Sequence, residues 1–127
     1  MKLVLVVEDQ SDNAEGLRMI LEAAGYRVSV APDGMVGLAF LASEKPAVIL
    51  ADFAMPYVSG ADLGRAVRAD PRLCDIPFVI LSGFSQSTVR ASFEDYDSFV
   101  GKPLSPEVVV PLVAHLARYG RPPSKSL

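Results

Sequence analysis

The sequence has a single cysteine, Cys74, so the chain can form neither an internal disulfide nor a metal site built from thiolates. It has no excess of positive charge, because 12 Lys and Arg residues stand against 15 Asp and Glu residues, and no basic stripe marks a nucleic-acid-binding surface. No apolar run is long enough to span a bilayer, and the run at 3–7 is too short for an export signal. We therefore expect a soluble, cytoplasmic protein that binds neither membranes nor, directly, nucleic acid.

What the sequence does have is a high apolar content, with 50% hydrophobic and 21% charged residues. This balance is typical of a globular domain with a real core, and a length of 127 residues fits one such domain. We expect the domain to span residues 1–119. Residues 120–127 contain two prolines and several polar residues and are predicted to form a flexible tail.

Continuous apolar runs, rather than alternating ones, predict strands that are buried on both faces of a parallel sheet. Such runs lie at 3–7, 47–51 and 78–81, and weaker runs lie at 27–31 and 98–100. Segments with helical spacing separate them, at 12–24, 35–43, 60–69, 87–93 and from 106 onward. This alternation of strand and helix predicts an α/β fold whose parallel strands are joined by right-handed crossovers.

Three helix starts carry capping signals. Asp12 and Glu15 have the spacing of a capping pair for the first helix. Ser59 is the predicted N-cap of the helix at 60–69. Ser105 is the predicted N-cap of the last helix, with Pro106 at its first position.

Polar residues follow four of the five predicted strands. In open parallel sheets, ligands bind beyond the carboxyl ends of the strands, and these ends lie at one edge of the sheet. We therefore expect three carboxylates, one hydroxyl and one ammonium to share a single pocket. The residues are Glu8, Asp9, Asp52, Ser82 and Lys102.

Three carboxylates held together repel one another unless a cation lies among them. Since oxygen atoms are the only ligands offered, Mg²⁺ is the cation that fits best. Mg²⁺ would also neutralise an incoming phosphoryl group, so that a carboxylate can attack phosphorus. Ser82 and Lys102 could contact the phosphoryl oxygens. The set of residues therefore predicts the formation of an aspartyl phosphate.

Four segments in this order resemble the CheY-like receiver domains of response regulators in bacterial two-component signalling. They are LVLVVED at 3–9, VILADFAMP at 48–56 followed by Ser59 and Gly60, IPFVILSG at 76–83 and FVGKP at 99–103. The resemblance covers the whole chain except its last few residues. It implies a flavodoxin-like single domain of five βα units, with a doubly wound parallel five-stranded sheet in the strand order 2-1-3-4-5.

The resemblance implies a role for each residue of the pocket. Asp52 would accept the phosphoryl group from the phosphohistidine of a histidine kinase or a histidine phosphotransfer protein. Glu8, Asp9 and Asp52, with the backbone carbonyl of Ala54, would hold Mg²⁺, and Lys102 would contact the phosphoryl group.

Two further positions match the switch of this family. Ser82 matches the hydroxyl that moves toward the phosphoryl group, and Phe99 matches the aromatic residue that then turns inward. Phosphorylation would remodel the face formed by the fourth helix, the fifth strand and the last helix. Phe99 can equally be an ordinary core residue. The bond between Lys102 and Pro103 is usually cis in this family.

The chain departs from the family pattern in three places. Ser82 stands where threonine is commoner, and Phe99 lacks the hydroxyl of the tyrosine in chemotaxis regulators. Between Ser82 and Lys102 the chain is about two residues shorter than the family pattern, so we expect a short or irregular fourth helix there. Phe84 occupies a position that tunes water access in this family, and its bulk is predicted to shield the acyl phosphate.

Two other functions fit parts of the pattern. A pseudo-receiver would bind partners without phosphorylation, but every pocket residue is in place. A phosphatase of the dehalogenase-like class also uses an aspartate nucleophile with Mg²⁺, but it needs a second aspartate two positions later, where this chain has Ala54. Because the expected phosphorylation modifies the chain itself, we do not expect an enzyme that turns over an external substrate.

Overall fold

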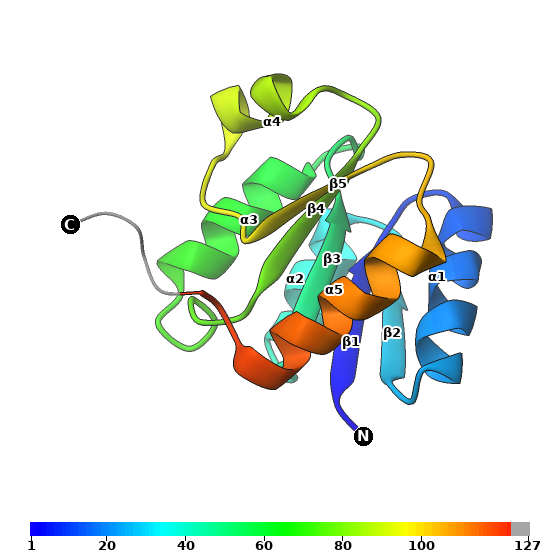
Figure 1. Cartoon of the computed structure of the whole chain (residues 1–127). Coiled ribbons are helices and arrows are strands. Elements are labelled where there is room, and N and C mark those ends of the chain that lie inside the picture. Colours follow the sequence, from blue (N-terminus) through cyan, green and yellow to red (C-terminus); the bar gives the residue numbers. More distant parts are fainter. Residues whose placement is uncertain (123–127) are drawn as a thin grey trace.

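Five strands form one parallel sheet in the computed structural model, which describes residues 1–122 (Figure 1). The order across the sheet is β2-β1-β3-β4-β5, as the resemblance implied. The strands are β1 (Leu3–Val7), β2 (Arg27–Ala31), β3 (Val48–Asp52), β4 (Phe78–Ser82) and β5 (Ser98–Gly101). The helices are α1 (Ser11–Ala23), α2 (Gly34–Leu41), α3 (Gly60–Ala69), α4 (Gln86–Ser92) and α5 (Pro106–Tyr119).

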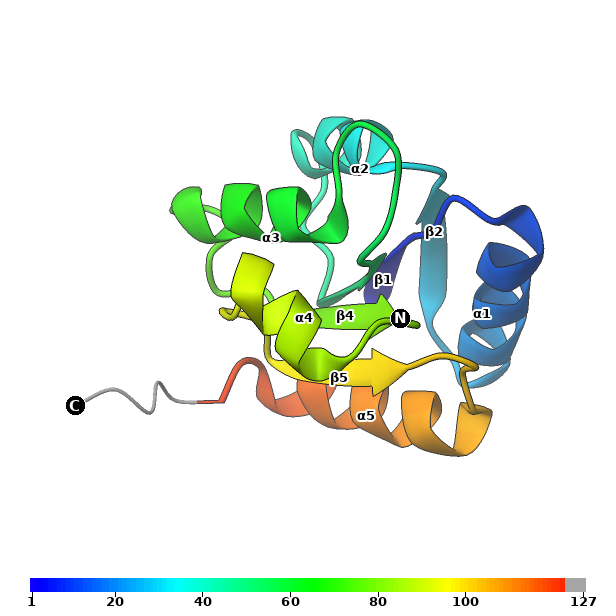
Figure 2. The same ribbon diagram turned by 90° about the horizontal axis from the view of Figure 1, so that it is seen from above.

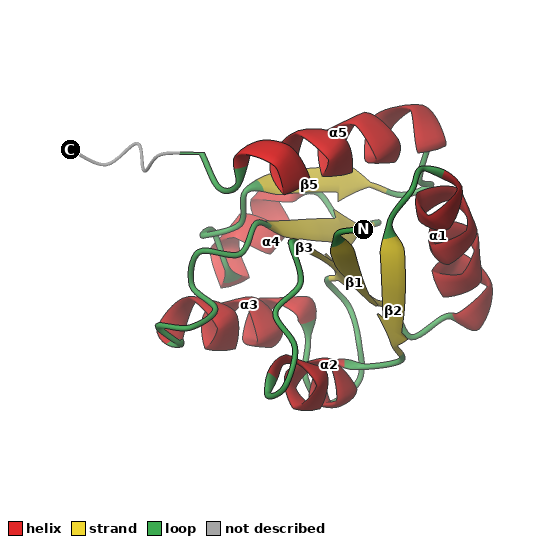
Figure 3. Cartoon of the chain, turned by 90° about the horizontal axis from the view of Figure 1, so that it is seen from below, coloured by secondary structure: helices red, strands yellow, loops and turns green. Residues whose placement is uncertain are grey.

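The helices cover both faces of the sheet (Figures 2 and 3). Helices α1 and α5 lie on one face, and α2, α3 and α4 lie on the other. Alternate residues of β1 show why its apolar run is continuous: Val4 packs with Leu17 of α1, whereas Leu5 belongs to the cluster on the opposite face. All residues of β3 and β4 are buried, because both faces and both edges of these strands are covered.

The two weakest apolar runs form the edge strands, β2 and β5. An edge strand is open on one side, so fewer of its side chains are buried. Arg27 and Val30 of β2 are exposed, and only Val100 of β5 is fully buried. Local sequence therefore reflects the place of each strand in the sheet.

Two of the three predicted helix starts agree with the structure, and one of the two also forms the cap hydrogen bond. Ser59 caps α3, since its hydroxyl accepts a hydrogen bond from the amide of Asp62, and Asp62 accepts one from the amide of Ser59. The capping pair predicted for α1 was wrong. This helix begins at Ser11, and Glu15 pairs with Arg18 instead.

The third prediction holds for position only. Ser105 precedes α5, and Pro106 opens it. However, the Ser105 hydroxyl donates to the carboxylate of Glu107 and does not cap the backbone.

Helix α4 is short, as expected, with 7 residues. The segment after it packs against α3, because Phe93 lies on Gly64, where a Cβ atom would come within 2.5 Å of the Phe93 ring. Arg65 of α3 also donates a hydrogen bond to the backbone carbonyl of Ser92 at the end of α4. The end of α4 and the residue after it are thus held against α3 by a ring contact and a hydrogen bond.

Residues 123–127 of the predicted flexible tail lie outside the described residues. Arg121, near the start of that tail, forms ion pairs with Asp95 and Asp97. Within residues 1–122, none of the helices is long and apolar enough to cross a bilayer.

Candidate functional site

The structure brings the predicted carboxylates together at the carboxyl edge of the sheet. Glu8 and Asp9 follow β1, and Asp52 is the last residue of β3. One carboxylate oxygen from each of the three lies within 4.8 Å of the others. Parallel pairing of β1 with β3 places Asp52 beside Glu8 and Asp9, although it lies 44 and 43 positions after them in the chain. The predicted convergence is confirmed.

Lys102 joins the three carboxylates from the end of β5. Its Nζ atom lies 3.1 Å from Oδ1 of Asp52 and 3.2 Å from Oε2 of Glu8. Glu8 and Asp52 are buried, with 1% and 6% of their surface exposed, whereas Asp9 is exposed. Among residues 1–122, Lys102 is the single cation in the ion pairs of this site, so three acidic groups share one positive charge.

Burial and charge set the ionisation of the two central groups. The pKa of Asp52 is raised from 3.8 to about 6, chiefly by burial. The hydrogen bond from Lys102 lowers this pKa, and the neighbouring Glu8 carboxylate raises it. Burial by itself lowers the pKa of Lys102. Its hydrogen bonds and its attraction to Asp52 and Glu8 outweigh burial, so the pKa of Lys102 is raised. At neutral pH, Lys102 is therefore charged and Asp52 is mostly an ionised carboxylate.

The acidic cluster has the properties of a site for a hard divalent cation. Its donor atoms are all carboxylate oxygens, and their charge exceeds that of Lys102. Mg²⁺ commonly binds one or two carboxylates and keeps several waters, which suits a cluster open to solvent at Asp9. Ala54, whose carbonyl was predicted as a further ligand, lies in the exposed part of the loop after β3.

Ser82 lies at the same edge of the sheet, at the end of β4, and is 2% exposed. Its hydroxyl oxygen accepts a hydrogen bond from the Phe84 amide at 2.8 Å and lies 3.4 Å from the Phe84 carbonyl oxygen, to which it donates. The hydroxyl thus takes part in a local turn with Phe84.

Phe99 packs against the core cluster on the α2, α3 and α4 face of the sheet. Its ring lies 6.4 Å from that of Tyr96, which in turn lies 6.3 Å from Phe93. Gln86 donates a hydrogen bond to the Tyr96 hydroxyl. The aromatic residue of the predicted switch therefore belongs to a row of rings that Gln86 of α4 contacts through Tyr96.

Sequence reasoning missed Phe53, which directly follows Asp52. The rings of Phe53 and Phe84 pack edge to face with their centroids 6.0 Å apart. Phe84 is 55% exposed, so the pair borders the site on the solvent side. An apolar residue next to the aspartate could have indicated such a border, but only the fold shows that its partner is Phe84.

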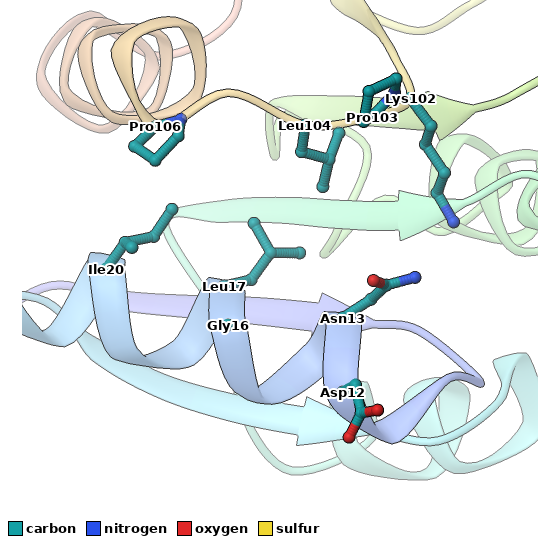
Figure 4. Close-up of a pocket in the computed structure, with 9 residues that line it drawn as sticks. All are labelled: Asp12, Asn13, Gly16, Leu17, Ile20, Lys102, Pro103, Leu104 and Pro106. Carbon is teal, nitrogen blue, oxygen red and sulfur yellow. The ribbon is translucent and has the colours of Figure 1, made fainter.

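A largely apolar groove runs from Lys102 along α1 (Figure 4). Leu17 and Ile20 of α1 point toward Leu104 and Pro106 on the opposite side. The full lining consists of Asp12, Asn13, Gly16, Leu17, Ile20, Lys102, Pro103, Leu104 and Pro106. The peptide bond between Lys102 and Pro103 is cis.

Comparison with curated proteins finds relatives that match most of this chain. The chain is 33% identical over 122 residues to the phosphate regulon transcriptional regulatory protein PhoB of Pseudomonas aeruginosa, which covers 94% of this chain and 53% of that protein. It is 34% identical over 115 residues to an uncharacterized 14.6 kDa protein of Leptolyngbya boryana, covering 87% and 86%. The chain thus spans about half the length of PhoB and most of the shorter relative.

Among solved structures, the signal receiver domain of a signal transduction histidine kinase from Syntrophus aciditrophicus is similar, with a TM-score of 0.88 and 30% identity. The match covers 100% of this chain and 98% of that one. The model of the response regulator receiver domain matches residues 4–114. The chain therefore belongs to the response regulator receiver domain family of two-component signalling.

Proposed function

We propose that this receiver domain is phosphorylated on Asp52 by a phosphohistidine of a histidine kinase or a histidine phosphotransfer protein, with Mg²⁺ as cofactor. One observation carries the proposal: Glu8, Asp9 and Asp52 form a cluster with excess negative charge, and Lys102 reaches into it. A cluster of this kind at a strand end suits the transfer of a charged phosphoryl group.

In the reaction, a carboxylate oxygen of Asp52 attacks phosphorus and forms a new P–O bond. The P–N bond of the donor breaks, and its imidazole leaves with the electron pair and takes up a proton. Lys102, which contacts Asp52 at 3.1 Å, is positioned to pair with a phosphoryl oxygen. Glu8, Asp9, Asp52 and the Ala54 carbonyl would hold Mg²⁺, which neutralises phosphoryl charge when bound.

Hydrolysis of the acyl phosphate would then reset the domain. Water attacks phosphorus, and the products are inorganic phosphate and the free Asp52 carboxylate. The chain returns to its starting state after modifying itself, so we do not regard it as an enzyme with an external substrate.

Ser82 and Phe99 would convert phosphorylation into a change of surface. A phosphoryl oxygen on Asp52 offers the Ser82 hydroxyl a charged acceptor in place of the Phe84 carbonyl, and such hydrogen bonds are stronger than neutral ones. Movement of Ser82 would free space for Phe99 and bias the face formed by α4, β5 and α5 between two states. A downstream protein would read that face.

We propose that the domain acts in the cytoplasm through protein partners and does not itself bind nucleic acid. Its formal charge of −3 is unfavourable for phosphate backbones. RpaA of Synechocystis, which is described as DNA-binding, matches this chain over only 50% of its own length.

Mass spectrometry tests the proposal. The purified chain is incubated with acetyl phosphate, with and without Mg²⁺, beside Asp52→Asn and Lys102→Gln variants. We expect one phosphoryl adduct on the wild type that requires Mg²⁺, none on Asp52→Asn, and strongly slowed labelling of Lys102→Gln. If a folded wild type stays unlabelled by a donor that labels another receiver, the chain is a pseudo-receiver.

A further inference from the structure

A second ionic cluster lies at the beginning of β5, at the opposite end of this strand from Lys102. Asp97 directly precedes β5, and its side chain is only 3% exposed. Its carboxylate accepts hydrogen bonds from Arg68 of α3 at 2.8 Å, from the Phe78 amide at 2.8 Å and from Arg121 at 2.9 Å. Three donors from separate parts of the fold thus meet at one carboxylate.

Arg121 connects the end of α5 to this cluster. Besides Asp97, its guanidinium binds Asp95 at 2.7 Å and the backbone carbonyl of Cys74 at 3.3 Å. Arg68 has a side chain that is 9% exposed and contacts Asp97 from the other side. The two arginines and two aspartates balance in charge. The cluster therefore holds the end of α5, α3 and the beginning of β5 together.

Strand β5 joins this cluster directly to the phosphorylation site. It has 4 residues, and Lys102 follows it at once. Among residues 1–122, the strand pairs with β4 alone. Its beginning is held by the hydrogen bond from the Asp97 amide to the Phe78 carbonyl, and its end by the hydrogen bond from the Lys102 amide to the Ser82 carbonyl, both 2.8 Å long. An extended strand of this length has little slack. A shift at its beginning is therefore passed on to its end.

We propose that Asp97 and Arg121 form a latch that positions Lys102 through β5, so that Arg121 is a positioning residue for the phosphorylation site. The effect on phosphorylation rests on the proposed function. The coupling is reciprocal, because linkage between two sites acts equally in both directions. Events that displace Arg121 from Asp97 therefore weaken the site, and occupation of the site changes how the chain after α5 is held.

The test uses the full chain and the variant Arg121→Gln, which removes the charge from a partly exposed side chain and leaves the pair of Arg68 and Asp97 intact. Arg118→Gln is the matched control, since Arg118 lies over the Tyr119 ring at the same end of α5. Hydrogen exchange of the Phe78 and Lys102 amides is measured by NMR. The concentration of acetyl phosphate that half-saturates labelling of Asp52 is measured on the same samples.

For Arg121→Gln we expect both amides to exchange about fivefold faster and the half-saturating concentration to rise about fivefold, at the low end of typical couplings. Arg118→Gln should change neither value, and Arg121→Lys should recover part of the loss. The proposal is overturned if exchange accelerates at Phe78 but not at Lys102, or at neither. Absence of labelling in the wild type would instead contradict the proposed function, while the exchange data would still decide the latch.

Discussion

The two ends of β5 carry ionic clusters that differ in their balance of charge. Near Lys102, the buried carboxylates of Glu8 and Asp52 and the exposed Asp9 share one ammonium. Near Asp97, two arginines face two aspartates, and Asp97 receives three hydrogen bonds. The first cluster keeps an excess of negative charge that a cation or a phosphoryl group can use.

The second cluster is balanced in charge, because two arginines face two aspartates. Both clusters contain buried acids, and burial alone would have marked either one as a functional site. The difference teaches that the balance of charge around a buried acid separates a reactive site from a structural one in this fold.

The largest expected effect breaks the balanced cluster. Asp97→Ala removes the close, buried carboxylate partner of Arg68 and leaves the exposed Asp95 carboxylate 3.8 Å from the guanidinium, which should lower the free energy of unfolding by about 3–5 kcal/mol. Urea unfolding followed by circular dichroism measures this loss. Asp75→Ala is the control, because it removes the exposed pair with Lys45 and should cost less than about 1 kcal/mol. Equal losses of unfolding free energy in Asp97→Ala and Asp75→Ala would contradict the structural role of the buried cluster.

A smaller effect of opposite sign is expected in the unbalanced cluster. The pKa of Asp52 is raised to about 6 from 3.8, chiefly by burial, so its ionised form opposes folding. In the presence of a chelator, Asp52→Asn should therefore raise the free energy of unfolding at pH 7 by about 1–3 kcal/mol. The gain should be absent near pH 4, grow up to about pH 6 and stay constant above it.

Asp62→Asn is the comparison for this pH series. The hydrogen bond from the Ser59 amide, with the hydrogen bond from Arg65, lowers the pKa of Asp62, so its ionised form favours folding. This variant should lose stability at neutral pH, and the loss should shrink as the pH falls below the ordinary pKa of aspartate. If Asp62→Asn gained stability at neutral pH, or if the effect of Asp52→Asn did not depend on pH, charge would not explain the difference between the two variants.

The smallest expected effect concerns access to the unbalanced cluster. Phe84→Glu removes the ring that packs on Phe53 beside the site and should shorten the lifetime of the acyl phosphate about threefold, equivalent to less than about 1 kcal/mol. Loss of the phosphoryl adduct is followed by mass spectrometry after the donor is removed. Tyr57→Glu adds the same charge at an exposed position and serves as control. If Phe84→Glu loses its phosphoryl group no faster than the wild type, the Phe84 ring does not shield the acyl phosphate from water.

Much of the fold could be read from local patterns. The continuous apolar runs at 3–7, 47–51 and 78–81 predict strands buried on both faces, and the structure places them as the central strands β1, β3 and β4. The cap of α3 was also recognised, since a serine at this position bonds within its own turn. The capping pair predicted for α1 was wrong, because Glu15 pairs with Arg18 along the helix instead of bonding the backbone at the first turn of the helix.

The sequence by itself determined the strand-helix alternation and the convergence of Glu8, Asp9, Asp52 and Lys102, because parallel strands must end at one edge. Only the tertiary structure decided which buried carboxylates have their negative charge balanced by nearby arginines. Asp97 and Arg121 are 24 residues apart and Arg68 is another 29 away, and nothing in their local sequence pairs them. Such pairing depends on how α3, β5 and the end of α5 pack, and packing is a property of the whole chain.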